Sequence, residues 1–191
     1  MKRVLIVFAA VAILATMASA QDLWSKGKMS VGVGVEGSLP TGDWGDFVNI
    51  GFGGLGIFQY SVINDLLITG QVGYTIWTEK SQKDLYGIDV KTSGEAWIVL
   101  AGAKYNIKSL TPGFYVMGQL GIYGTTGTAK VPAYSYGGYS VPASETSESE
   151  TKFVFCPGIG YQIGPIDASV KYVINGDVSN VALNVAYIFP L

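Results

Sequence analysis

The sequence contains no histidine, and its only arginine is Arg3. Histidine is the side chain that ordinarily acts as a base near neutral pH, so its absence argues against catalysis. Without arginine the chain lacks the planar donor that grips phosphates, and a net charge of −2 disfavours nucleic acid. We therefore expect no enzyme activity, no catalytic residue, no cofactor, no metal site and no nucleic-acid partner.

Charge is scarce as well. Charged residues make up 14% of the chain, against roughly 25% in typical soluble domains, whereas apolar residues reach 49%. The single cysteine, Cys156, excludes an internal disulfide, and we expect it to be a small buried residue. After Ala20 no apolar run approaches the ~18 residues of a transmembrane helix. Such a chain can still face lipid if it forms strands whose alternate side chains point outward.

The first twenty residues follow a targeting pattern. Lys2 and Arg3 precede an unbroken apolar run of twelve residues from Val4 to Ala15, and Ala18-Ser19-Ala20 has the small-x-small form of a cleavage site. The pattern predicts a secretory signal peptide over residues 1–20 and a single domain over residues 21–191.

The stretch MSVGVGVEGSL, Met29 to Leu39, alternates apolar side chains with glycine, serine and glutamate. Alternate side chains of a strand point to opposite faces, so this stretch has one apolar face and one small, polar face. Similar patterns predict eight strands, each near the ~9–11 residues of a tilted membrane-crossing strand. They cover Lys28–Leu39, Ile50–Ser61, Leu66–Thr78, Glu95–Tyr105, Phe114–Gly124, Lys152–Ile163, Ile166–Ile174 and Val181–Phe189. The phases of the second strand, which is rich in glycine, and of the fourth, which is apolar on both faces, stay open.

The connections alternate in length. Pro40–Asn49, Glu79–Gly94 and Thr125–Thr151 are long, whereas Val62–Asp65 and Gly164–Pro165 are short. In an up-and-down sheet odd and even connections lie at opposite ends, so one end carries most of the loops, as in outer-membrane barrels. We expect the three long loops to face outward.

Eight such strands can close into a soluble barrel with apolar residues inside, or into a membrane barrel with them outside. The polar faces hold mostly small or uncharged residues, which suit a narrow lumen better than a water-facing surface. The predicted fold is therefore an all-β, eight-stranded antiparallel up-and-down transmembrane β-barrel. Charges inside it must be paired, because an unpaired buried charge costs several kcal/mol. The expected interior polar network comprises Glu36, Gln71, Lys104, Gln119, Asp167 and Lys171, on the condition that the fourth strand takes the phase that turns Lys104 inward.

Aromatic residues near the strand ends predict two rings at the membrane interfaces. The ring on the short-turn side comprises Tyr60, Tyr105, Phe114, Tyr161, Tyr187 and Phe189. The ring on the loop side comprises Phe52, Trp77, Trp97, Tyr123, Phe153 and Tyr172.

Three stretches carry a resemblance to a known family. They are VGVGVEGSLPTGDWGD from Val31 to Asp46, Gly102 to Tyr105 before a turn, and LNVAYIF from Leu183 to Phe189. With the glycine-rich second strand, they resemble the small eight-stranded outer-membrane barrels of the OmpA transmembrane-domain and opacity-protein kind. The resemblance covers essentially the whole chain after residue 20 and is to an architecture, since none of these stretches is a catalytic motif.

Three functions are compatible with this pattern. The first is an integral outer-membrane barrel of a Gram-negative-type bacterium with a non-enzymatic structural or surface-interaction role. Its partners would be outer-membrane lipid, the outer-membrane assembly machinery and an unknown surface partner, which Tyr134, Tyr136 and Tyr139 could contact in the third long loop. The alternatives are a narrow small-solute pore and a soluble periplasmic, lipocalin-like binder of an apolar ligand.

Overall fold

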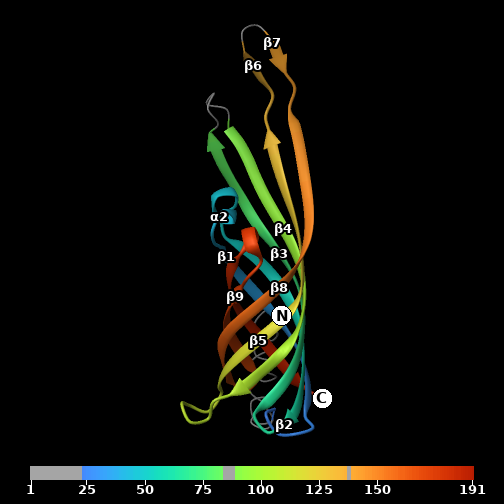
Figure 1. Cartoon of the computed structure of the whole chain (residues 1–191), viewed down its shortest axis with the longest axis vertical. Helices are drawn as coiled ribbons and strands as arrows, with labels where there is room; N and C mark the ends of the chain where they lie inside the picture. The colour runs from blue at the N-terminus through green and yellow to red at the C-terminus, as the bar shows by residue number, and fades with distance from the viewer. Residues whose placement is uncertain (1–22, 84–88, 137–138) are drawn as a thin grey trace, which may run out of the picture.

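The computed structural model describes residues 23–83, 89–136 and 139–191. The predicted signal peptide lies outside the described residues. Most of the described residues form β-strands (Figure 1). The strands of the main sheet are β1 (Met29–Pro40), β2 (Gly51–Ile63), β3 (Leu66–Lys83), β4 (Asp89–Asn106), β5 (Phe114–Val131), β8 (Ser144–Ile163), β9 (Ile166–Val173) and β10 (Asn180–Pro190). The smaller elements are α2 (Trp44–Phe47), β6 (Tyr134–Tyr136), β7 (Tyr139–Val141) and η2 (Gly176–Val178).

Eight antiparallel strands close into a barrel, which confirms the predicted fold. Each strand pairs with its neighbours in the ring, and closure comes from the pairing of β1 with β10, in which Val33 lies opposite Tyr187. On its other side β1 pairs with β2, where Val33 lies opposite Gly56. Closure leaves no open sheet edge within the ring, as a hydrocarbon environment requires.

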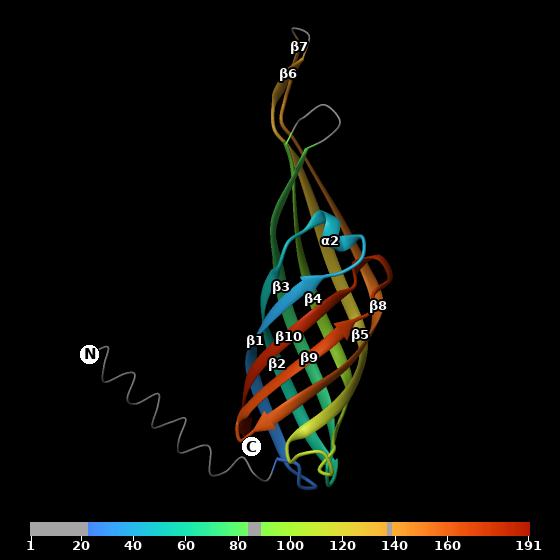
Figure 2. The same ribbon diagram turned by 90° about the vertical axis from the view of Figure 1, so that its left-hand side faces the viewer.

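Four strands continue well beyond the ring. We call this part, formed by residues 78–83 of β3, 89–94 of β4, 125–131 of β5 and 144–151 of β8, the sheet extension; it rises past α2 in both ribbon views (Figures 1 and 2). The prediction of loops over Glu79–Gly94 and Thr125–Thr151 is therefore wrong for most of their residues. Their polar sequences pair as strands because hydroxyl and charged side chains meet across the ladder, as Thr126 meets Ser149 at 2.9 Å between hydroxyl oxygens.

The remaining connections follow the predicted pattern. Pro40–Asn49 is a connection that contains the short helix α2, and the opposite end of the barrel has tight turns. In one of these turns Asp65 adopts the left-handed backbone conformation at φ 71°, and in another Gly164 adopts it at φ 58°. None of the helices in the described part of the chain is both long enough and apolar enough to cross a membrane.

The barrel exposes apolar side chains on its outside and buries polar ones in its lumen. Val33, Val72 and Val185 are exposed, whereas Gln59 and Lys171 are buried. The structure also settles the two open phases. β2 turns Gln59 and Leu55 inward, and β4 turns Lys104 inward and Trp97 outward.

Two members of the predicted loop-side aromatic ring lie in the lumen instead. Trp77 is 1% exposed and Tyr123 is 4% exposed. Trp77 lies on the inward face of β3 with Thr75, and Tyr123 lies on the inward face of β5 with Gln119. Strand alternation fixes the face of each position, whatever side chain it carries. Their predicted place in that ring is therefore wrong, whereas Phe52, Trp97, Phe153 and Tyr172 do face outward.

Candidate functional site

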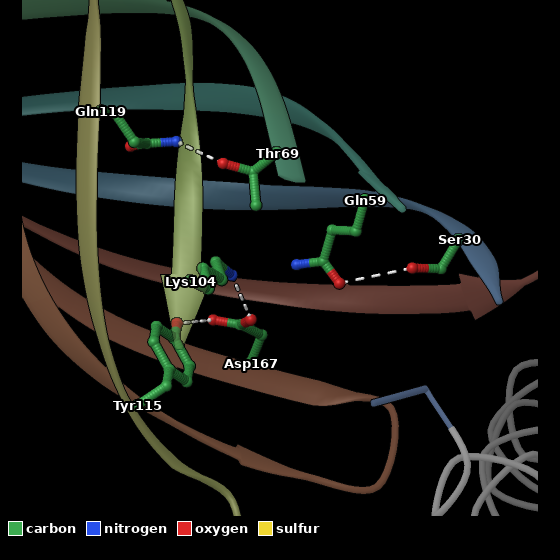
Figure 3. Close-up of polar contacts among 7 residues, drawn as sticks. All are labelled: Ser30, Gln59, Thr69, Lys104, Tyr115, Gln119 and Asp167. Atoms are coloured by element: carbon green, nitrogen blue, oxygen red, sulfur yellow. Dashed lines mark hydrogen bonds and ion pairs between the residues drawn. The ribbon is translucent and has the colours of Figure 1, made fainter. Parts of the chain in front are cut away.

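A buried ion pair lies in the half of the lumen nearest the short turns. The Nζ atom of Lys104 on β4 donates a hydrogen bond to Oδ2 of Asp167 on β9 at 2.6 Å. The hydroxyl of Tyr115 on β5 donates to the other carboxylate oxygen at 2.5 Å, and the Lys104 ammonium lies 4.6 Å from the centre of the Tyr115 ring (Figure 3). Two donors thus satisfy this carboxylate, as a charge in a low-dielectric interior requires.

A second ion pair lies in the lumen farther from the short turns. Lys171 of β9 lies 3.4 Å from Glu36 of β1, measured from Nζ to Oε2. The other Glu36 carboxylate oxygen accepts a hydrogen bond of 2.9 Å from the hydroxyl of Thr75. Neither pair joins adjacent strands: β10 lies between β1 and β9, and β5 and β8 lie between β4 and β9, so each pair links non-adjacent strands through the lumen.

Neutral side chains complete the interior polar network. Gln119 donates from Nε2 to the Thr69 hydroxyl at 3.3 Å, and Ser30 donates to Oε1 of Gln59 at the same distance (Figure 3). Gln71 is buried in the lumen, but its Nε2 has no partner among the described residues. The structure thus places all six predicted network residues inward. Lys104 pairs with Asp167 and Lys171 pairs with Glu36. Gln119 bonds to Thr69, and the Gln71 amide nitrogen has no hydrogen-bond partner among the described residues.

The half of the lumen toward the sheet extension contains a buried apolar cluster. Its buried cluster comprises Val48, Trp77, Ala96, Ile98, Leu100, Tyr123, Val154, Cys156, Val173, Val178 and Ala182. Sequence reasoning missed this cluster because it assigned the apolar faces to the outside as a rule. The signal was present in the fourth predicted strand, whose two faces are both apolar since its inner face lines this cluster.

Side chains close the lumen at both ends. At the short-turn end Leu23 packs on Leu55 and Ile188, and the ring of Trp24 lies 5.7 Å from that of Tyr115. At the loop end Trp44 covers the apolar cluster, with its ring centre 5.7 Å from that of Trp77 in an edge-to-face arrangement. Fully buried side chains of all sizes occupy the space between, as expected for an eight-stranded barrel.

A groove opens above the Trp44 cover. It has a volume of about 840 Å³ and lies between α2 and the sheet extension; we call it the loop-end groove. Its lining includes the aromatic rings of Trp44 and Phe47, hydroxyls of the extension, and carboxylates. The carboxylates are those of Asp43, Glu148 and Glu150. No lysine or arginine is among the lining residues in the described part of the chain.

Helix α2 is fixed in place by contacts with the sheet extension. Lys80 of β3 donates from Nζ to the backbone carbonyl oxygen of Gly45 at 2.6 Å. The hydroxyl of Thr92 on β4 donates to the backbone carbonyl oxygen of Phe47. The Trp44 ring rests on Gly94, where an added Cβ would come within 2.7 Å of it. A helix of four residues has too few internal bonds to hold itself, so these contacts determine its position.

The predicted contact residues of the third long loop lie at its tip. Tyr134 pairs with Val141 and Tyr136 with Tyr139 in the two-stranded sheet β6–β7, which lies beyond the end of the sheet extension (Figure 1). The structure describes their backbone pairing alone, so a contact role for these tyrosines stays a prediction. Within the described ranges, no group of three or more histidine, cysteine, aspartate or glutamate side chains is placed to hold a metal ion.

Solved structures of similar shape identify the fold. The structure of Ail, the attachment invasion locus protein of Yersinia pestis, matches with a TM-score of 0.57 at 20% identity, covering 86% of this chain and 99% of that one. Ail in complex with the heparin analogue sucrose octasulfate matches with a TM-score of 0.53 at 22% identity, covering 86% and 99%. A major outer membrane protein from Thermus thermophilus matches with a TM-score of 0.53 at 12% identity, covering 84% and 99%.

These likenesses show that the chain has the β-barrel fold of small outer-membrane proteins. No protein-family model and no curated protein sequence matches the chain.

Proposed function

We propose that the chain is an integral outer-membrane β-barrel that presents the sheet extension and the loop-end groove to the exterior and acts through surface interactions, without enzyme activity. The observation that carries this proposal is the exposed apolar belt around the ring. Every strand of the ring contributes to it, with Val33, Phe58, Val72, Val99, Leu120, Ile159, Val170 and Val185 as examples. A continuous apolar surface of this kind fits hydrocarbon and is unfavourable in water.

The filled lumen does not favour the alternative of a solute pore. Trp77 and Tyr115 are both almost completely buried, and Leu23 and Trp44 cover the two ends. A lipocalin-like binder is disfavoured too, because such a barrel holds an apolar ligand inside and presents charges outside. Here the outward valines and the inward ion pairs have the opposite arrangement.

The loop-end groove supports a role in surface interactions, and its charge restricts the class of partner that can bind there. The heparin analogue in the Ail complex is a polysulfate and requires cationic partners. The loop-end groove instead carries Asp43, Glu148 and Glu150. We therefore propose a surface partner other than a sulfated polysaccharide, together with outer-membrane lipid around the belt and the assembly machinery during insertion.

Membrane fractionation and gel mobility test the proposal. The full chain, expressed in a Gram-negative host, should remain in the outer-membrane fraction after a carbonate wash. Unboiled and boiled samples should migrate differently in detergent gels, because a closed barrel resists unfolding by detergent. Recovery of the folded protein from the soluble periplasm would contradict the proposal, and so would a large, steady conductance in planar bilayers.

A further inference from the structure

The loop-end groove has the size and lining of a small-molecule site. Its volume of about 840 Å³ lies within the roughly 300–1,000 Å³ of known ligand pockets. One wall is the paired backbone of β4, β5 and β8, and the other is α2, which Lys80 and Thr92 fix to that same sheet. Sites built on such elements hold their side chains in defined positions.

We propose that the loop-end groove binds an organic cation, a molecule that joins an ammonium group to an aromatic or alkyl body. The inference rests on the proposed function, because it requires the groove to face the exterior, and it names the class of ligand that the groove takes.

The apolar part of the ligand has a place to lie. Phe47 is 51% exposed although it lines the groove, and Trp44 lies beside it on the same helix. The Trp44 ring is held from below by Gly94 and by the edge-to-face contact with Trp77, so it is a fixed surface. Aromatic faces attract ammonium groups through the negative charge of their π-systems, and alkylated ammonium ligands are commonly bound in this way.

The charge of the groove selects the sign of the ligand. Glu150 is compensated by Lys152, whose Nζ lies 2.8 Å from its carboxylate. The carboxylates of Asp43 and Glu148 form no hydrogen bond or ion pair with other described residues. The groove therefore holds two carboxylates without an ion-pair partner among the described residues, beside an aromatic surface, an arrangement that favours a cation over an anion.

A titration with matched probes tests the assignment. The full barrel, refolded in nonionic detergent, is titrated with benzyltrimethylammonium and followed by backbone amide NMR shifts. Benzyl alcohol and benzenesulfonate serve as neutral and anionic probes with the same ring. We expect saturable shifts for the cation, confined to residues 43–48, 92–93, 125–129 and 146–150, with weaker binding of the alcohol and none of the sulfonate.

Charge-removing variants distinguish the groove from general attraction to an acidic protein. Asp43→Asn combined with Glu148→Gln should weaken binding of the cation about fivefold or more, because two charges are lost at short range. Glu145→Gln is the control: it removes the same charge from β8, but on the opposite face, where Glu145 pairs with Lys130 at 3.5 Å. It should leave the affinity within about twofold.

The proposal is overturned if benzenesulfonate binds as tightly as the cation, or if the Asp43 and Glu148 variant binds the cation with unchanged affinity. Trp44→Leu should also weaken binding, and a gel-mobility check shows whether each variant is folded. A folded barrel that fractionates with the outer membrane but does not bind the cation refutes the ligand class and leaves the proposed function standing.

Discussion

The ring and the sheet extension are built from the same strands but have different outer surfaces. Along β5 the outward side chains change from Leu120 and Ile122 to Thr126 and Thr128. Strand pairing continues without a register shift across this change, from Ile122 opposite Phe153 to Thr128 opposite Ser147. Backbone pairing therefore does not distinguish the two parts. What differs is the solvent that the outer face meets, which we infer to be lipid below and water above.

The ion pairs of the two parts differ in the same way. Lys104 and Asp167 lie in the lumen with side chains 4% and 2% exposed, whereas Lys130 and Glu145 on the extension are 48% and 58% exposed. Removing one partner of a buried ion pair leaves the other charge in the lumen without compensation, so it lowers stability strongly. An exposed ion pair contributes little to stability, because water solvates each charge when its partner is absent. Substitutions at three kinds of position test this difference between the two parts.

Removing one member of the buried pair should have the largest effect. Asp167→Asn leaves the Lys104 ammonium without its counter-charge in the lumen, and we expect a loss of about 3–5 kcal/mol in the free energy of unfolding. The measurement is urea unfolding of the barrel in lipid vesicles. Lys130→Met on the extension is the matched control and should cost less than about 1 kcal/mol. Equal losses for the two variants would show that the lumen is as well solvated as the surface.

A charge placed on the apolar belt should have the next largest effect. Val72→Lys puts an ammonium on the exposed face of β3 in the middle of the belt, and we expect a loss of about 2–4 kcal/mol in the free energy of unfolding. Thr126→Lys places the same charge on the outer face of the extension, where water solvates it, and should change stability by less than about 1 kcal/mol. A tolerated lysine at residue 72 would contradict the lipid-facing belt.

A side chain added beneath the Trp44 cover should have the smallest effect of the three. In Gly94→Ala the new Cβ would lie 2.7 Å from the Trp44 ring, so α2 must shift, at a cost of about 1–3 kcal/mol. Gly37→Ala is the control, since a Cβ there meets no heavy atom within 4 Å. Unfolding curves and tryptophan emission measure both changes. Unchanged emission in Gly94→Ala would show that Trp44 does not rest on β4.

The fold is predictable because alternation marks each strand, but alternation alone does not say where a strand ends. The predicted strands stop at Thr78 and Gly124, where apolar residues give way to threonine, serine and glutamate. These residues pair as strands above the ring because opposite hydroxyls and charges meet across the ladder. The fourth predicted strand is ambiguous because Ala96, Ile98 and Leu100 line an apolar part of the lumen, an arrangement that depends on the packing of the whole ring.

The contacts within the candidate sites are harder to predict from the sequence than the fold is. Strand phase alone can place charges on the inward face, but the carboxylate that meets each lysine depends on the stagger of strands far apart in the chain. Asp167 and Lys104 are 63 residues apart and come together only through ring closure. The loop-end groove depends on α2 folding against Gly94, and no local pattern around Trp44 indicates that contact.

Spin labels on the two outer surfaces report whether the belt meets lipid and the sheet extension meets water. In a Cys156→Ala background, nitroxides are attached at residues 33, 72 and 185 of the belt and at residues 126 and 147 of the extension, in lipid vesicles. We expect belt labels to collide more with oxygen than with a water-soluble nickel complex, and extension labels to show the reverse. Belt labels that collide freely with the nickel complex would show that the belt faces water and not lipid.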